Sequence, residues 1–320
     1  MPKEPLYFKE KGAIACALRP LSLLWRAAGF ARRAMAARPY RARVPVVCVG
    51  NLVAGGSGKT PVVMALSRQL MGEGFRVGIV SRGYGRRSRG CLLVKEDSTA
   101  AEAGDEPLEM ALRLPSVRIA VGADRAAAAR MLEHEVDVII MDDGLQNLSL
   151  RQDFQIAVFD SQAGFGNGFV LPAGPLREPL SRLSFVDAVV ITGGKNPALK
   201  RGLERYGRPV FYAVTKMGRL KKGLRAVAFA GIGKPEKFFM SLAAAGVDIV
   251  RARAFADHHN YTRAELVKLL AMGLPVLTTG KDFVKIPADL RSRFTPVYMD
   301  SQLDTSMLGL LRSTIISLGI

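Results

Sequence analysis

The chain has 320 residues, of which 49% are hydrophobic and 23% charged, and this composition excludes an intrinsically disordered protein and fits about two folded domains. Its formal net charge of +18 indicates an anionic partner, such as nucleic acid, acidic lipid or a phosphorylated substrate. Three scattered cysteines suggest neither a disulfide framework nor a Cys metal cluster, and no apolar run reaches the roughly 18 to 20 residues that span a membrane.

The first 43 residues form the most unusual segment, with ten Lys or Arg and two Glu. Pro20 can begin a helix, and apolar side chains then recur on one helical face: Leu21, Leu24, Trp25, Ala28, Ala31 and Met35. Such a basic amphipathic helix suits the headgroup region of an anionic membrane. The alternative is a helix that packs on its own domain and keeps its arginines in water.

Residues 44–61 carry the strongest functional motif. An apolar run ends in glycines, Gly58-Lys59-Thr60 follows, and residues 62–70 show helical periodicity. A strand, loop and helix in this order can turn backbone N–H groups and the helix N-terminus toward phosphate oxygens. Val53 stands where the usual pattern has a glycine, so Gly55 and Gly56 must supply the turn. The predicted nucleotide-binding residues are Val53, Ala54, Gly55, Gly56, Ser57, Gly58, Lys59 and Thr60. An ordinary glycine-rich turn is the alternative.

The remaining pattern predicts an α/β fold. Strand signals at residues 76–81, 91–94, 117–121, 136–141, 154–159, 188–192 and 210–214 are interspersed with helical segments, which indicates a P-loop NTPase-like, doubly wound, mostly parallel sheet. A basic stretch, residues 195–225, precedes a second strand–helix pattern. We therefore expect an N-terminal helix in residues 1–43, a phosphate-loop domain in residues 44–215 and a smaller α/β domain in residues 216–320.

Acidic residues fall at the ends of the predicted strands, where ligands bind in such sheets. Asp142 and Asp143 end a buried strand, and with Thr60 they are the predicted Mg²⁺ ligands. Asp105 precedes an apolar helix and has two interpretations. It caps the helix N-terminus, or it takes or orients a hydroxyl proton during phosphoryl transfer.

Two further residues are candidates for catalysis. Arg177 lies in a long irregular loop and suits bidentate binding of a phosphate, although an ion pair with Glu178 is equally compatible with the sequence. His258 follows Asp257 between a strand and a helix, where it can accept or orient a proton or can belong to a polar loop.

Taken together, these motifs resemble the tetraacyldisaccharide 4′-kinase (lipid A 4′-kinase) family. They occur in the family's order between about residues 44 and 285, and Val53 matches the family's own variant of the phosphate loop. The residues that carry the resemblance are Gly50-Asn51-Leu52, 55–61, 81–85, 104–107, 142–146, 171–178, 255–258 and 279–282.

The resemblance implies a P-loop kinase that uses ATP and Mg²⁺. Its acceptor would be the 4′-hydroxyl of a tetraacylated glucosamine disaccharide 1-phosphate, at the cytoplasmic face of the bacterial inner membrane. Asp105 and His258 would act together on that hydroxyl, while Lys59 and Arg177 would bind phosphate. The resemblance implies peripheral attachment to an anionic membrane surface, without a transmembrane helix.

Two other functional classes fit parts of the sequence. A nucleotide switch would hydrolyse ATP slowly and use the N-terminal helix to bind a protein partner. A nucleic-acid-binding ATPase is suggested by the net charge and by residues 82–89, but the sequence contains no recognisable nucleic-acid module. We expect neither a nucleic-acid partner nor an obligate protein partner.

Overall fold

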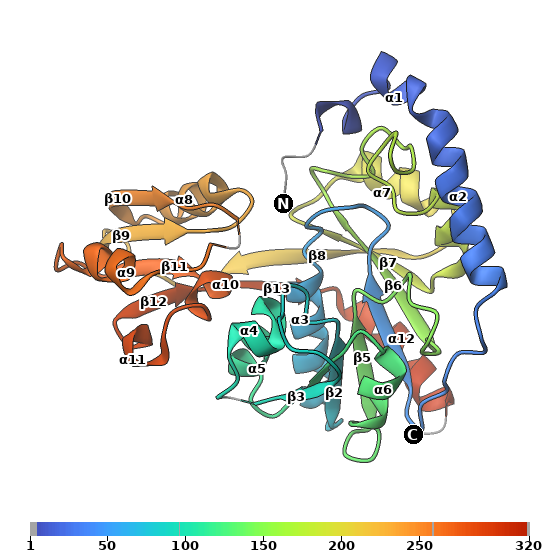
Figure 1. Ribbon diagram of the computed structural model, residues 1–320, viewed down its shortest axis with the longest axis horizontal. Helices are drawn as coiled ribbons and strands as arrows, with labels where there is room; N and C mark the ends of the chain where they lie inside the picture. Colours follow the sequence, from blue (N-terminus) through green and yellow to red (C-terminus); the bar gives the residue numbers. More distant parts are fainter. Residues whose placement is uncertain (1–4, 96, 258, 319–320) are drawn as a thin grey trace.

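The computed structural model describes residues 5–95, 97–257 and 259–318, and this part of the chain forms two sheets. The larger sheet has nine strands in the order β13-β8-β7-β6-β1-β5-β2-β4-β3, and the smaller one projects from it (Figure 1). The strands of the larger sheet are β1 (Val46–Gly50), β2 (Val77–Ser81), β3 (Leu92–Val94), β4 (Arg118–Val121), β5 (Val138–Asp142), β6 (Phe154–Asp160), β7 (Ala188–Thr192), β8 (Val210–Met217) and β13 (Met299–Leu303).

The centre of the larger sheet is parallel and buried. Strand β1 pairs in parallel with both β5 and β6, while the edge strands β3 and β13 run antiparallel to their neighbours. Continuous apolar runs such as Val46–Val49 suit strands covered on both faces. One face is covered by α3 (Lys59–Gly72), α5 (Asp105–Arg113) and α12 (Thr305–Ser317), and the other by α6 (Arg125–Arg130) and α7 (Pro197–Glu204). The predicted doubly wound, mostly parallel sheet is confirmed.

The smaller sheet is wholly parallel, in the order β10-β9-β11-β12. Phe229 is buried at its centre and packs edge-to-face on Phe255, Tyr261 and Phe294. Its elements are β9 (Arg225–Ala230), α8 (Pro235–Ala244), β10 (Asp248–Ala254), α9 (Arg263–Leu270), β11 (Val276–Thr279), α10 (Gly280–Phe283), α11 (Ala288–Arg291) and β12 (Phe294–Val297).

The C-terminal segment corrects the predicted limit of the smaller domain, residues 216–320. Strand β13 pairs with β8 of the larger sheet, with Met299 opposite Met217 and Leu303 opposite Ala213. Helix α12 then buries Met307, Leu311 and Ile315 in the larger core. The smaller unit therefore ends before residue 299, and β8 and β13 lie side by side where the chain passes between the two units (Figure 1).

The N-terminal region forms α1 (Ala13–Ala17) and α2 (Arg19–Ala34), and α2 lies along the outside of the larger unit (Figure 1). The Ser22 hydroxyl donates a hydrogen bond to the Val170 carbonyl (2.7 Å), and the Trp25 indole donates one to the Arg177 carbonyl (3.0 Å). Large apolar side chains of this helix remain in solvent, among them Leu24 (66% exposed) and Phe30 (74% exposed). Helix α2 thus docks on its own domain and still presents an apolar surface.

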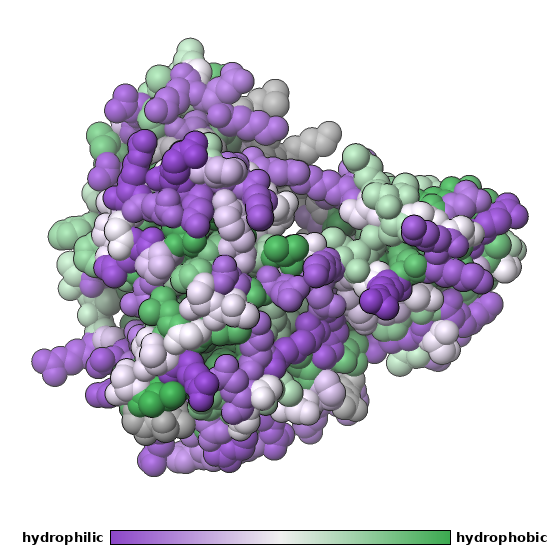
Figure 2. Space-filling view, turned by 180° about the vertical axis from the view of Figure 1, so that it is seen from behind, coloured by the Kyte–Doolittle hydropathy of each residue, from purple (hydrophilic) through white to green (hydrophobic). Residues whose placement is uncertain are grey.

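The surface elsewhere reflects the composition. Hydrophilic side chains cover much of the face seen in the space-filling view, over both the larger unit and the projecting smaller one (Figure 2). Among the described residues, no helix is both long and apolar enough to cross a membrane.

Candidate active site

The loop between β1 and α3 is held in place from several directions. The Thr192 hydroxyl donates to the Ser57 carbonyl (2.9 Å), and the Asn51 amide donates to the Val53 carbonyl (2.6 Å). Gly58 has φ of +73° and precedes the first residue of α3, and a Cβ there would lie 3.0 Å from the Thr192 hydroxyl oxygen. Because only glycine adopts this conformation without strain, Gly58 lets the loop enter the helix with its N–H groups free to bind phosphate.

Val53 is a packing residue of this loop. Its side chain is buried, it forms an isolated β-bridge with Leu176, and both belong to the same apolar core. The next residue, Ala54, donates its N–H to the Pro175 carbonyl (2.8 Å). The departure from the usual glycine therefore ties the phosphate loop to residues 175–177.

Lys59 faces the acidic end of β5. Its Nζ lies 3.4 Å from Asp143 Oδ1, and Arg177 Nη1 lies 3.3 Å from the same oxygen. Burial disfavours the charged carboxyl, but the two cations outweigh burial and hold the pKa of Asp143 below its ordinary value. The structure thus brings Lys59, Asp143 and Arg177 together, whereas Glu178 pairs with Arg33 of α2 instead of with Arg177.

Asp142 lies deeper, at the end of β5. Its Oδ2 accepts a hydrogen bond from the Ser81 hydroxyl (3.1 Å), and its buried Oδ1 has no hydrogen-bond partner within the described chain. Burial and the nearby Glu106 carboxylate raise the pKa of Asp142 to about 7. A buried carboxylate oxygen without a partner is costly, so Asp142 Oδ1 fits the role of a ligand-binding oxygen.

The oxygens around Asp142 suit Mg²⁺. The Thr60 hydroxyl donates to Glu106 Oε2 (3.2 Å), so two predicted ligands and one unforeseen carboxylate converge on the start of α3. Mg²⁺ prefers such hard oxygens and usually completes its shell with phosphate and water. The described residues contain no group of three His, Cys, Asp or Glu that would hold a metal by themselves. Asp143, engaged by two cations, is the least available of the predicted ligands.

Asp105 is the first residue of α5. The N-cap residue is Gly104, with φ of +92°, so Asp105 does not occupy the capping position. The capping interpretation of Asp105 is therefore wrong. Its Oδ2 lies 3.3 Å from Lys285 Nζ of the smaller unit. His258 lies outside the described residues, so its pairing with Asp105 stays a prediction.

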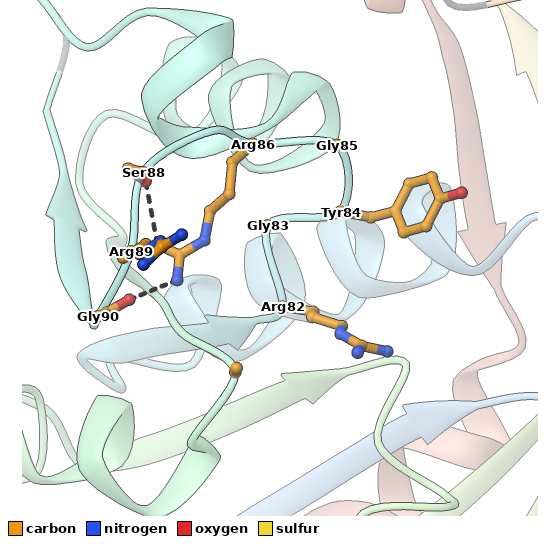
Figure 3. Close-up of a pocket in the computed structure, with 9 residues that line it drawn as sticks. Arg82, Gly83, Tyr84, Gly85, Arg86, Ser88, Arg89 and Gly90 are labelled. Atoms are coloured by element: carbon orange, nitrogen blue, oxygen red, sulfur yellow. Dashed lines mark hydrogen bonds between the residues drawn. The ribbon is translucent and has the colours of Figure 1, made fainter.

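A basic pocket of about 440 Å³ lies at the loop after β2, lined by residues 82–86, 88–90 and Ala123. Arg86 donates to the Ser88 hydroxyl (3.3 Å) and to the Gly90 carbonyl, and so closes this loop on itself. Arg82 and Tyr84 point away from that cluster (Figure 3). Because none of its lining residues is acidic, the pocket suits an anionic group.

Comparison with known proteins identifies the family to which this chain belongs. Residues 14–315 match the family model described as tetraacyldisaccharide-1-P 4′-kinase (LpxK). The chain belongs to this family. It is 43% identical over 298 residues to the tetraacyldisaccharide 4′-kinase of Rhodospirillum centenum, covering 88% of this chain and 85% of that one. It is 39% identical over 317 residues to the enzyme of Paramagnetospirillum magneticum, covering 96% of each.

A solved structure of the same family has a similar fold. The crystal structure of LpxK from Aquifex aeolicus in complex with ATP aligns with a TM-score of 0.76 and 28% identity, covering 94% of this chain and 99% of that one. The 4′-kinase family thus accounts for both the sequence and the fold of the chain.

Three residues of this 4′-kinase site were not predicted from the sequence. Glu106 contacts Thr60, Lys281 pairs with Glu106, and Lys285 contacts Asp105. Glu106 and Lys281 lie inside the motifs that carried the resemblance, which was the only available signal. The contacts of Lys281 and Lys285 depend on how the two units pack together.

Proposed function

We propose that this chain transfers the γ-phosphate of ATP to the 4′-hydroxyl of a tetraacylated glucosamine disaccharide 1-phosphate. The observation that carries the proposal is the convergence of Lys59, Asp142 and Asp143 at a phosphate loop, in a chain of the 4′-kinase family. The relative from Aquifex aeolicus, solved in complex with ATP, supports ATP as the donor.

Each residue has a role in this reaction. Phosphoryl transfer depends mainly on positioning and on neutralising charge, so Lys59 and the loop N–H groups would bind the β- and γ-phosphates. Mg²⁺, held by Thr60 and Asp142, would offset further phosphate charge when bound. Arg177 would stabilise charge on the transferred group, and Asp105, with His258, would take or orient the proton of the acceptor hydroxyl.

The proposal is tested by following the label from [γ-³²P]ATP. The full chain is incubated with Mg²⁺ and the lipid disaccharide 1-phosphate in detergent micelles. Label on the 4′-oxygen supports the kinase. ATP hydrolysis that leaves the lipid unlabelled contradicts it and favours the nucleotide switch.

We also infer that the enzyme works at an anionic membrane surface, the cytoplasmic face of the inner membrane. An acceptor with four acyl chains stays in the bilayer, so the enzyme must come to it. Helix α2 supports this inference because it is basic and keeps Leu24 and Phe30 in solvent although it is docked through Ser22.

Replacing both Leu24 and Phe30 with Glu is expected to weaken association with acidic vesicles at least several-fold, because it removes buried apolar area and adds negative charge. Cosedimentation with phosphatidylglycerol vesicles measures the effect. The matched control is Val267→Glu, since Val267 is an exposed apolar residue on α9 of the smaller unit. Equal sedimentation of the α2 variant and the control would contradict a membrane role for α2.

A further inference from the structure

Two lysines of the smaller unit reach two adjacent acids of the larger one. Lys281 lies in α10 and Lys285 just after it, while Asp105 and Glu106 begin α5. Lys281 forms an ion pair with Glu106, and Lys285 Nζ lies 3.3 Å from Asp105 Oδ2. The two ion pairs join the units at the start of α5, the helix that carries Asp105, the predicted catalytic carboxylate.

Contacts within the smaller unit hold Lys285 in position. Its side chain is only 6% exposed, and its Nζ also lies 3.4 Å from Oδ1 of Asp282, a fully buried residue. Asp282 Oδ2 accepts hydrogen bonds from the Gly231 N–H (2.9 Å) and the Thr279 hydroxyl (2.7 Å). Because Asp282 is held by the backbone and by a helix cap, the smaller unit determines where the ammonium lies.

The two units approach closely beside this lysine. Helix α10 packs against α5, and a Cβ added at Gly280 would meet a Glu109 carboxylate oxygen and would lie 2.9 Å from the Tyr298 ring. Glu106, which pairs with Lys281, also connects to the nucleotide site, because it accepts the hydrogen bond of Thr60 in the phosphate loop. The arrangement of the units and the geometry of the site are therefore linked.

A buried ammonium between two carboxylates is a poor source of stability, because the loss of hydration offsets most of the attraction. Such a group is better suited to orientation, since charge-assisted contacts fix the geometry of a carboxylate. We propose that Lys285 is a positioning residue for Asp105, which it holds in place from the smaller unit. The inference rests on the proposed function, in which Asp105 acts on the acceptor hydroxyl.

A double-mutant cycle tests this role. Wild type, Lys285→Met, Asp105→Asn and the double variant are compared by single-turnover label transfer to the lipid at saturating Mg-ATP. Lys285→Met is expected to lower the rate about tenfold in the wild-type background but less than about twofold in the Asp105→Asn background, as for residues that act as one unit. The KM for ATP should stay within about twofold of the wild-type value. The control Lys268→Met, at an exposed lysine of α9, should change neither quantity.

Lys285→Arg separates charge from packing and replaces Lys285→Met in the cycle if the methionine variant does not fold. A positioning role predicts that Arg retains more of the rate than Met, whereas a packing role predicts the reverse. If Lys285→Met lowers the rate equally in both Asp105 backgrounds, or does not change it, the positioning role is overturned. The proposed kinase function would not be affected by that result. A wild-type protein that leaves the lipid unlabelled would remove the proposed function, and with it this role for Lys285.

Discussion

Lys59→Ala is expected to lower the rate of lipid phosphorylation by about two to three orders of magnitude, the size of effect seen when one charge-stabilising donor is removed from an active site. Lys59 is the cation of the phosphate loop. It is the first residue of α3, and its Nζ lies against Asp143. The expected loss lies in kcat and in ATP affinity together, because the lysine would contact phosphates in both the bound and the transition state. Single-turnover label transfer and nucleotide binding measure the two quantities.

The fold should survive this change. The Lys59 side chain pairs with Asp143, while the loop itself is held by Asn51, Thr192 and Pro175. Circular dichroism and the melting temperature of the nucleotide-free protein check this point, with Lys268→Ala as the matched surface control. Normal turnover by a folded Lys59→Ala protein would remove the phosphate loop from the mechanism.

The phosphate loop and the two aspartates could be predicted because their chemistry follows from local order along the chain. A strand, a glycine-rich turn and a helix place Lys59 at a helix N-terminus, and parallel strands end at one edge of the sheet. Asp142 ends β5, which pairs directly with β1, and Asp143 follows it. Neighbouring strand ends were therefore enough to bring these residues together.

The contacts between the units could not be predicted in this way. Lys281 and Glu106 are 175 positions apart, and their contact depends on how two separately folded sheets meet. Strand β13 could not be predicted from the sequence for a different reason. Its sequence, Met-Asp-Ser-Gln-Leu, contains no β-branched residue, and it pairs only with β8 at the sheet edge. Tertiary pairing, not local propensity, makes it a strand.

The docking of α2 shows a similar limit. Periodicity predicted one apolar face, and an apolar face ordinarily packs on its domain. Here the contacts with the larger unit come instead from Ser22, from the Trp25 indole N–H and from the ion pair of Arg33 with Glu178. Sequence pattern defines a helix face, but it does not say whether protein or lipid covers that face.

Asp105→Asn is expected to lower kcat for lipid phosphorylation by about two to four orders of magnitude, the range found for positioned general bases, while ATP affinity stays nearly unchanged. Asn keeps the shape of the side chain and one acceptor oxygen but cannot accept the hydroxyl proton. Asp105 lies beside Glu106 at the edge of the nucleotide site, where an acceptor hydroxyl would arrive. Rapid-quench measurement of label transfer and isothermal titration with an ATP analogue separate the two effects.

The melting temperature discriminates between the catalytic role and a structural one. A helix cap contributes roughly 0.5 to 2 kcal/mol, so the loss of a capping Asp would lower the melting temperature by several degrees. In this structure the N-cap residue of α5 is Gly104, and Asp105 contacts Lys285 of the other unit. We therefore expect a large loss of kcat with little loss of helix stability. A variant that melts early but turns over normally when folded would show that Asp105 supports the fold and that another group takes the acceptor proton.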